Sequence, residues 1–146
     1  MKALPYKEGG IFSVPLGARV DCLGVIARAP RKGGLVLAYF FERTSVAALS
    51  PRTAVDVAKV GNLYLMEGRW SVVAEVPNWR KETWPVPLLR RREPLSGRVY
   101  LVRYDDELHA VDECQVEHDA GNYPEDVVWG ARAAEAKLRH LLNVGR

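Results

Sequence analysis

Strand signals dominate residues 10–111: apolar and polar positions that alternate with a period of two, β-branched and aromatic enrichment, and Gly or Pro between the segments. In the first such segment, the side chains of Phe12, Val14 and Leu16 fall on one face. Pro15 lacks the amide donor that a strand ladder needs, so we expect this strand to end there or to lie at a sheet edge.

The next two runs are apolar on both faces and predict a long hairpin. They are RVDCLGVIAR and LVLAYFFE, residues 19–28 and 35–42. The segment APRKGG between them contains a proline and two adjacent glycines, which favour a turn.

A short helix is predicted to begin at Ser50 and Pro51, because a serine oxygen can cap free amides and proline fits a first helical turn. Residues 54–58 then carry an apolar stripe formed by two alanines and a valine. Gly61 can close this helix in a left-handed conformation.

A second hairpin is predicted from NLYLM and RWSVVAEV, residues 62–66 and 69–76, around a Glu67-Gly68 turn. Residues 77–97 follow and contain four of the nine prolines. Proline removes ladder donors and fixes the backbone in an extended form, so this segment is predicted to be an ordered loop with a short edge strand.

The last elements are a third hairpin and a helix. The hairpin pairs residues 98–104 with residues 107–111 across a turn at Asp105 and Asp106. The helix is indicated by apolar residues at spacings of three and four, ending near Gly145. These apolar residues are Ala131, Ala134, Leu138, Leu141 and Leu142.

Together these elements predict an α+β fold of mostly antiparallel strands. We expect a small SH3-like or partly open barrel with one short helix and a C-terminal helix packed on the sheet. No repeat or linker divides the chain, so residues 1–146 are expected to form one domain.

Composition and hydropathy place the chain among ordinary globular proteins. Hydrophobic residues make up 48% and charged residues 27%, a balance that excludes a disordered chain. The longest apolar run, residues 34–41, is too short to cross a bilayer. No segment has the pattern of a secretory leader, so the cytoplasm is the expected compartment.

Charge is distributed unevenly along the chain, although the formal total is only +3. Residues 1–104 hold 17 Lys and Arg against 8 Asp and Glu, whereas residues 105–126 hold nine carboxylates and no Lys or Arg. Such polarity can steer a charged partner, or the two stretches can pair with each other inside the fold.

No arrangement of residues predicts catalysis or a cofactor. The histidines at positions 109, 118 and 140 stand in no recognised nucleophile setting, and G-x-S-x-G, P-loop and dinucleotide motifs are absent from the sequence. The cluster from Asp112 to Asp119 matches no calcium or zinc spacing. We therefore expect a binding protein that is not an enzyme and has no metal and no cofactor.

A mixture of aromatic and cationic residues marks the proline-rich loop. Trp79 and Trp84 flank Arg80 and Lys81, a combination found in protein-binding patches and also in single-stranded nucleic-acid sites. The alternative for both rings is packing at the end of the core, and the continuation WPVPLL favours that role for Trp84.

The order of several segments resembles the immunity protein 26 family. The matching pieces, over roughly residues 9–138, are GGIFSVPLG, Gly24-Val25-Ile26, LVLAYFFE, NLYLMEGRWSVVAEVPNW, TWPVPLLRR and PEDVVWGARAAEAKL. The resemblance implies a bacterial antidote that binds a cognate toxin domain, without catalytic residues. The alternative that the residues leave open is a β-barrel regulatory or adaptor module that binds nucleic acid or a peptide.

If the chain is an immunity protein, its partner is a protein, and a nucleic acid or membrane partner is not expected; the oligomeric state stays open. A basic toxin would be met by carboxylates, an acidic one by Arg80, Lys81 and residues 90–92. The predicted contact residues are Asp105, Asp106, Glu107, Asp112, Glu113, Glu117, Trp79, Arg80 and Lys81.

Overall fold

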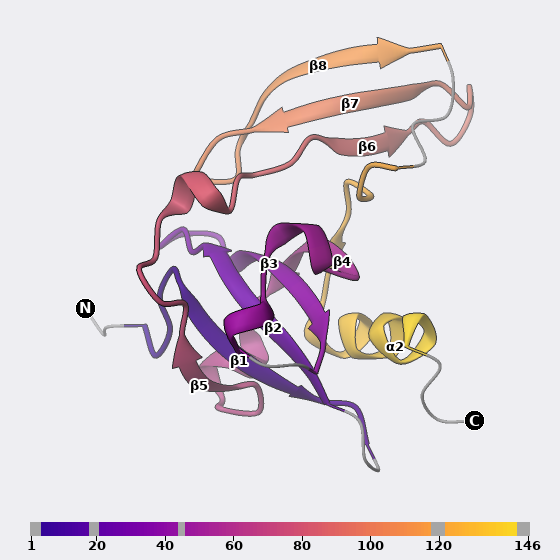
Figure 1. Ribbon diagram of the computed structural model, residues 1–146. Helices are drawn as coiled ribbons and strands as arrows, with labels where there is room; N and C mark the ends of the chain where they lie inside the picture. The colour runs from indigo at the N-terminus through magenta and orange to yellow at the C-terminus, as the bar shows by residue number, and fades with distance from the viewer. Residues whose placement is uncertain (1–3, 18–20, 44–45, 118–121, 143–146) are drawn as a thin grey trace.

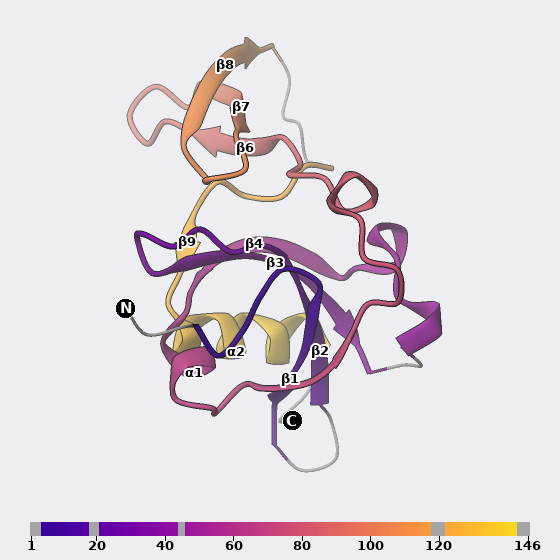
Figure 2. The ribbon, with the colours of Figure 1, turned by 90° about the vertical axis from the view of Figure 1, so that its left-hand side faces the viewer.

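The computed structural model describes residues 4–17, 21–43, 46–117 and 122–142. Two β-sheets and a C-terminal helix form the fold (Figure 1). The larger sheet, here the main sheet, lies between the helix on one side and the smaller sheet on the other (Figure 2).

Six strands build the main sheet, in the order β5-β1-β2-β3-β4-β9. All neighbours are antiparallel except β4 and β9, which run parallel. The strands are β1 (Gly10–Pro15), β2 (Asp21–Arg28), β3 (Leu35–Glu42), β4 (Asp56–Gly61), β5 (Ser71–Glu75) and β9 (Val128–Trp129).

One face of the main sheet packs against α2 (Ala131–Leu141). The buried helix residues Ala131, Ala134 and Leu138 meet strand residues that include Phe12. The Phe12 ring stacks on Trp70, with ring centroids 5.4 Å apart. The indole Nε1 of Trp70 also donates a 2.9 Å hydrogen bond to the carboxylate of Glu135 on α2, so one aromatic residue links the helix to the sheet.

The opposite face of the main sheet is covered by loop segments. Its alternate strand residues, among them Val25 and Leu37, pack with Trp84 from the proline-rich loop and with Leu108 from the turn after β7. The side chains of β2 and β3 therefore divide between two cores, which explains why these strands are apolar on both faces.

The smaller sheet, here the projecting sheet, has the strand order β6-β7-β8. It comprises β6 (Leu89–Arg92), β7 (Val99–Tyr104) and β8 (Ala110–Val116), all antiparallel. In Figure 1 it extends beyond the main sheet. Buried residues are few in it, namely Leu89, Val99 and Val102.

Most of the predicted elements are confirmed. The hairpin of β2 and β3, the short strand β6 after the proline-rich segment and the helix α2 lie where the pattern placed them. The hairpin of β7 and β8 is also present, but its second strand begins at Ala110 and not at Glu107, because residues 105–109 form the turn. β8 is longer than expected, because it continues to Val116 through the acidic residues.

The predictions for residues 50–66 are wrong. Only Pro51–Thr53 forms a single 3-10 turn. Of the apolar stripe that follows, Ala54 and Val55 precede β4, and Ala58 lies within it and pairs with Ala38. Residues Leu63–Met66 form the short helix α1 instead of a strand. The chain must cross from β4 beside β3 to β5 beside β1, so this segment packs against the sheet face and has no strand partner.

The expected α+β class of mostly antiparallel strands is confirmed, but no closed barrel is found among the described residues. Within the described residues the main sheet stays open, with β5 and β9 as its edges, and the projecting sheet is a separate three-stranded unit. A sheet closes into a barrel to bury one face and remove its edges. Here α2 covers one face and loops cover the other, so both faces are buried without closure.

Gly24 tests the packing between β1 and β2. A Cβ atom at this position would overlap the ring of Phe12, whereas a Cβ at Gly61 would meet only atoms at 3.9 and 4.0 Å. We expect Gly24→Ala to lower the free energy of unfolding by about 1–3 kcal/mol through overpacking, and Gly61→Ala to change it by less than about 1 kcal/mol. Urea denaturation measures both, and equal effects would contradict the packing described.

Candidate protein-binding site

The predicted carboxylates gather on one hairpin of the projecting sheet. This acidic hairpin comprises β7, the turn at residues 105–109, β8 and Glu117. Asp112 and Glu113 lie within β8, and Asp105, Asp106 and Glu107 lie in the turn. The six carboxylates that the sequence singled out therefore all lie on one hairpin, from its turn to the residue after β8, but they have different roles.

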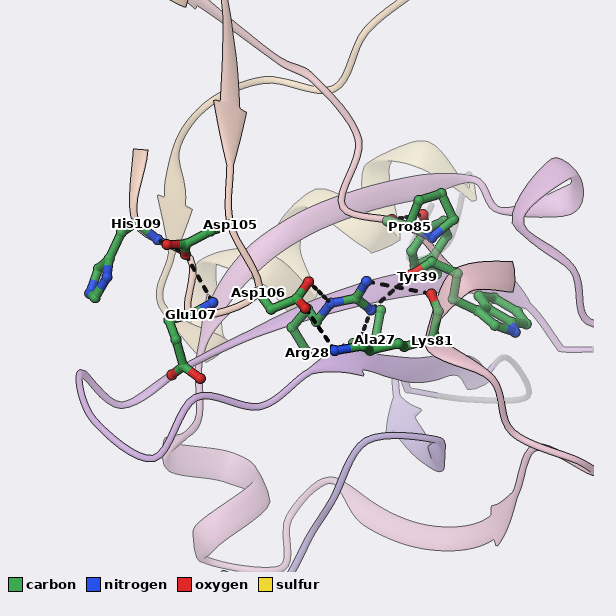
Figure 3. A network of polar contacts seen from close by, with 10 residues as sticks. Ala27, Arg28, Tyr39, Lys81, Pro85, Asp105, Asp106, Glu107 and His109 are labelled. Atoms are coloured by element: carbon green, nitrogen blue, oxygen red, sulfur yellow. Dashed lines mark hydrogen bonds and ion pairs between the residues drawn. The ribbon is translucent and has the colours of Figure 1, made fainter. Parts of the chain in front are cut away.

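Asp106 joins the turn to the main sheet through an ion-pair network (Figure 3). Its two carboxylate oxygens accept 2.8 Å hydrogen bonds from Nε of Arg28, on β2, and from Nζ of Lys81. The Arg28 side chain is only 5% exposed and also donates to the carbonyl oxygens of Ala27, at 2.6 Å, and Trp84, at 3.0 Å. Asp106 thus neutralises a buried cation.

The pKa values agree with this geometry. The hydrogen bonds from Lys81 and Arg28 hold the pKa of the Asp106 carboxyl below its ordinary value. The hydrogen bond to Asp106 raises the pKa of Lys81. Asp106 and Lys81 were predicted as contacts for toxins of opposite charge, yet they bind each other, so neither is an unpaired charge for a partner.

Asp105 shapes the turn itself. Its Oδ1 accepts 2.9 Å hydrogen bonds from the backbone amides of Glu107 and His109. These bonds hold Leu108 at a φ of 61°, a left-handed conformation uncommon for leucine, and its side chain is buried in the core above the main sheet. Asp105 therefore positions the hairpin against the main sheet.

A second buried ion pair contacts the projecting sheet through Tyr104, the last residue of β7 and the neighbour of Asp105. Nζ of Lys59, on β4, lies 2.7 Å from Oδ1 of Asp126, and the two side chains are 8% and 5% exposed. The hydroxyl of Tyr104 donates to the same carboxylate, at 2.8 and 2.9 Å, and the Lys59 ammonium lies 4.0 Å from the centroid of the Tyr104 ring.

Burial alone would lower the pKa of Lys59, but the hydrogen bonds with Asp126 and Tyr104 outweigh burial and raise it. Lys59 is therefore a charged ammonium in the fold. Sequence reasoning missed both Lys59 and Arg28 as partners of the acidic stretch. The available signal was that each is a single cation inside an apolar strand, where an unpaired charge would be costly.

Three predicted carboxylates stay open to solvent. Glu107, Asp112 and Glu117 are exposed, and none of them forms an ion pair with another described residue. Glu113, by contrast, binds the guanidinium of Arg91 on β6. The open acidic surface, defined by Glu107, Asp112 and Glu117, is therefore smaller than the sequence implied.

The aromatic residues of the proline-rich loop belong mainly to the core. Trp84 is 3% exposed and contacts Tyr39 and Phe41 edge-on, as its sequence context suggested. Trp79 is half-buried and stacks on Trp84, with ring centroids 6.2 Å apart. Arg80 beside it is exposed and 4.0 Å from Glu82. Trp84 therefore offers no stacking surface for a nucleic-acid base.

The described residues contain no group of three or more side chains placed to hold a metal ion. His118 and Asp119, which the acidic cluster included, lie outside those residues. The search for membrane spans, over the same part of the chain, finds no helix with the length and apolarity to cross a bilayer.

Comparison with known proteins gives one match. The family model for immunity protein 26 matches residues 7–101, more than half of the chain. The matched range covers β1 to β6 and ends within β7, so β8 and α2 lie beyond it. No curated protein and no solved structure matches the chain.

Asp126→Asn tests the buried pair. The change keeps the shape of the side chain but leaves the ammonium of Lys59 without its carboxylate, so we expect the free energy of unfolding to fall by about 3 kcal/mol or more. The matched control is Asp21→Asn, which breaks an exposed pair with Arg43 and should cost less than about 1 kcal/mol. Chemical denaturation at neutral pH compares them, and a small effect at both sites would contradict the role of Asp126.

Asp106→Asn should change how stability depends on pH. The folded pKa of Asp106 lies below its unfolded value, so its contribution is present above about pH 4 and is lost as the pH falls through the folded pKa. Because the carboxylate is half exposed, we expect it to be worth about 1 kcal/mol at pH 7. Denaturation of both proteins from pH 7 to pH 2 should show curves that converge in acid, and a constant difference would refute the assignment.

Proposed function

This chain belongs to the immunity protein 26 family and is an immunity protein that neutralises a cognate toxin, and we propose that the acidic hairpin contacts that toxin. Immunity proteins of this family act by binding and not by catalysis. We place the encounter in the cytoplasm of the producing cell. The observation that carries the proposal is the open acidic surface of Glu107, Asp112 and Glu117.

Internal pairing explains why these carboxylates are the best candidates. Asp106 and Asp126 neutralise the buried cations Arg28 and Lys59, and Glu113 binds Arg91. Glu107, Asp112 and Glu117 form no ion pair with another described residue, so they can meet a basic surface without breaking an ion pair of the fold. Carboxylates placed in this way raise the rate of encounter with a cationic partner.

The hairpin is also held in a fixed position. Asp106 anchors its turn to β2, and Tyr104 on β7 shares the buried pair of Lys59 and Asp126. A surface that is ordered before binding loses less conformational entropy in a complex. The hairpin therefore presents its charges on a rigid support, as a tight inhibitor requires.

The basic residues are less suited to contact an acidic toxin than the open carboxylates are to contact a basic one. Lys81 is bound to Asp106, Arg91 to Glu113, and Arg90 lies 3.9 Å from Glu125. A partner that used these cations would have to compete with existing ion pairs. We therefore propose a basic toxin surface as the target, with Trp79 and Arg80 outside the central contact.

A charge-reversal pair tests the proposed surface. Glu107→Lys with Glu117→Lys should slow association with the cognate toxin domain, to be sought as the variable C-terminal domain of a large secreted protein, by about tenfold in low salt, because steering is lost. The matched control, Glu42→Lys with Glu67→Lys, makes the same change in net charge at exposed positions on the main sheet side. Stopped-flow or surface-plasmon measurements at two salt concentrations give the rates.

Co-expression of that toxin domain provides the functional readout, scored as growth rescue. We expect rescue by the unmodified chain and by the control variant, and weaker rescue by the hairpin variant. Equal loss in both variants would assign the effect to net charge, and no loss in either would place the toxin on another surface.

A further inference from the structure

The two edges of the projecting sheet differ. Beyond β6, the chain at residues 124–126 runs alongside, and the amide of Arg90 donates to Pro124 O at 2.7 Å while the amide of Asp126 donates to Arg90 O at 2.8 Å. Beyond β8, no described segment pairs with the strand. One edge is therefore closed by the chain itself. Among the described residues the other edge has no strand partner, and one of the β8 amides, that of Glu113, donates at 2.9 Å to the neighbouring Asp112 carboxylate.

We infer that the open edge of β8 binds an extended, basic segment of the toxin as an added β-strand. This inference rests on the proposed function and names the binding mode of the same hairpin. In β-strand addition, backbone hydrogen bonds supply affinity and alternate side chains supply specificity. The edge is long enough for it, since β8 has seven residues and spans about 24 Å at about 3.4 Å per residue.

Exposure on both faces of β8 favours an added strand. Its first six residues, Ala110 to Gln115, are all exposed, and Val111 is 47% exposed. A strand laid along β8 would cover side chains above and below the sheet as well as the backbone edge. β8 begins directly after the turn that Asp105 holds by two hydrogen bonds, so this edge is ordered before the partner binds.

The carboxylates along β8 favour a basic partner strand over a second copy of this chain. Asp112 projects from β8, and Glu107 and Glu117 flank the strand, whereas Glu113 is already paired with Arg91. Two copies of this chain paired edge to edge would bring like charges together, which is destabilising, and carboxylates on an edge are a common protection against self-association. A partner strand with Lys or Arg at alternate positions would instead find opposite charges across the new ladder.

The main sheet also has an open edge, at β5, but this edge fits a basic strand less well. β5 pairs with β1 across a register shift between Ile11 and Phe12, which distorts the ladder. Its one charged residue, Glu75, already binds Lys7. β5 therefore serves as the internal comparison for β8.

Amide hydrogen exchange on the unmodified chain gives the first test, with the cognate toxin domain of the growth-rescue experiment as the probe. In the complex, alternate amides of β8 should exchange at least tenfold more slowly than in the isolated chain, while β5 amides should not change. Protection on β5 alone would overturn the inference. Concentration-dependent protection without toxin would assign the edge to a second copy and would also overturn it.

Adjacent proline substitutions give the second test. Cys114 and Gln115 are uncharged, exposed neighbours on β8, and successive amides of a strand point to opposite edges, so one of these amides faces β7 and the other faces outward. The outward position is the one whose exchange slows in the complex. Proline there should leave the fold intact by circular dichroism and weaken toxin binding at least tenfold, whereas alanine at the same position should not.

The two hypotheses can fail separately. If the outward proline binds toxin normally but the Glu107→Lys, Glu117→Lys variant associates slowly, strand addition is overturned and the acidic contact stands. If both variants bind as the unmodified chain does, the hairpin is not the contact surface and both are overturned.

Discussion

The position of the projecting sheet depends on buried charge that must be neutralised. Arg28 and Lys59 lie in strands of the main sheet with side chains almost removed from water, and an unpaired cation there would be strongly destabilising. Their carboxylate partners, Asp106 and Asp126, come from the two ends of the acidic stretch. The requirement for neutrality thus fixes the projecting sheet against the main sheet at two separate points. Apolar contact contributes less there, because the projecting sheet has few buried residues.

Sequence patterns were sufficient to predict a strand or helix wherever one physical signal dominated the segment. The strands β2 and β3 are apolar on both faces, and α2 has a helical stripe of alanines and leucines, so local periodicity predicted them. The patterns failed at residues 50–66, where short apolar runs suit helix and strand equally. There the chain has to pass from β4, near one edge of the main sheet, to β5 at the other edge, and this path decides whether a helix or a strand forms. The path is a property of the whole fold.

The acidic stretch shows a similar limit. Counting charges indicated that it would either bind a partner or pair internally, and the structure shows internal pairing for Asp106, Glu113 and Asp126. Glu107, Asp112 and Glu117 are left for solvent or a partner. No local pattern distinguishes these two groups, because their partners are far away in the chain. The family match ends in β7, so it describes the scaffold more fully than it describes this hairpin.

The tryptophans have a practical consequence for spectroscopy. Trp70 and Trp84 lie on opposite faces of the main sheet, Trp79 stacks on Trp84, and Trp129 is in β9. β6, β7 and β8 contain no indole. Intrinsic tryptophan emission therefore reports on the scaffold and on the turn, where Leu108 shares a core with Trp84. It is nearly blind to fraying of β7 and β8 away from the turn, so an optical melting curve can look intact while that part of the recognition element has already opened.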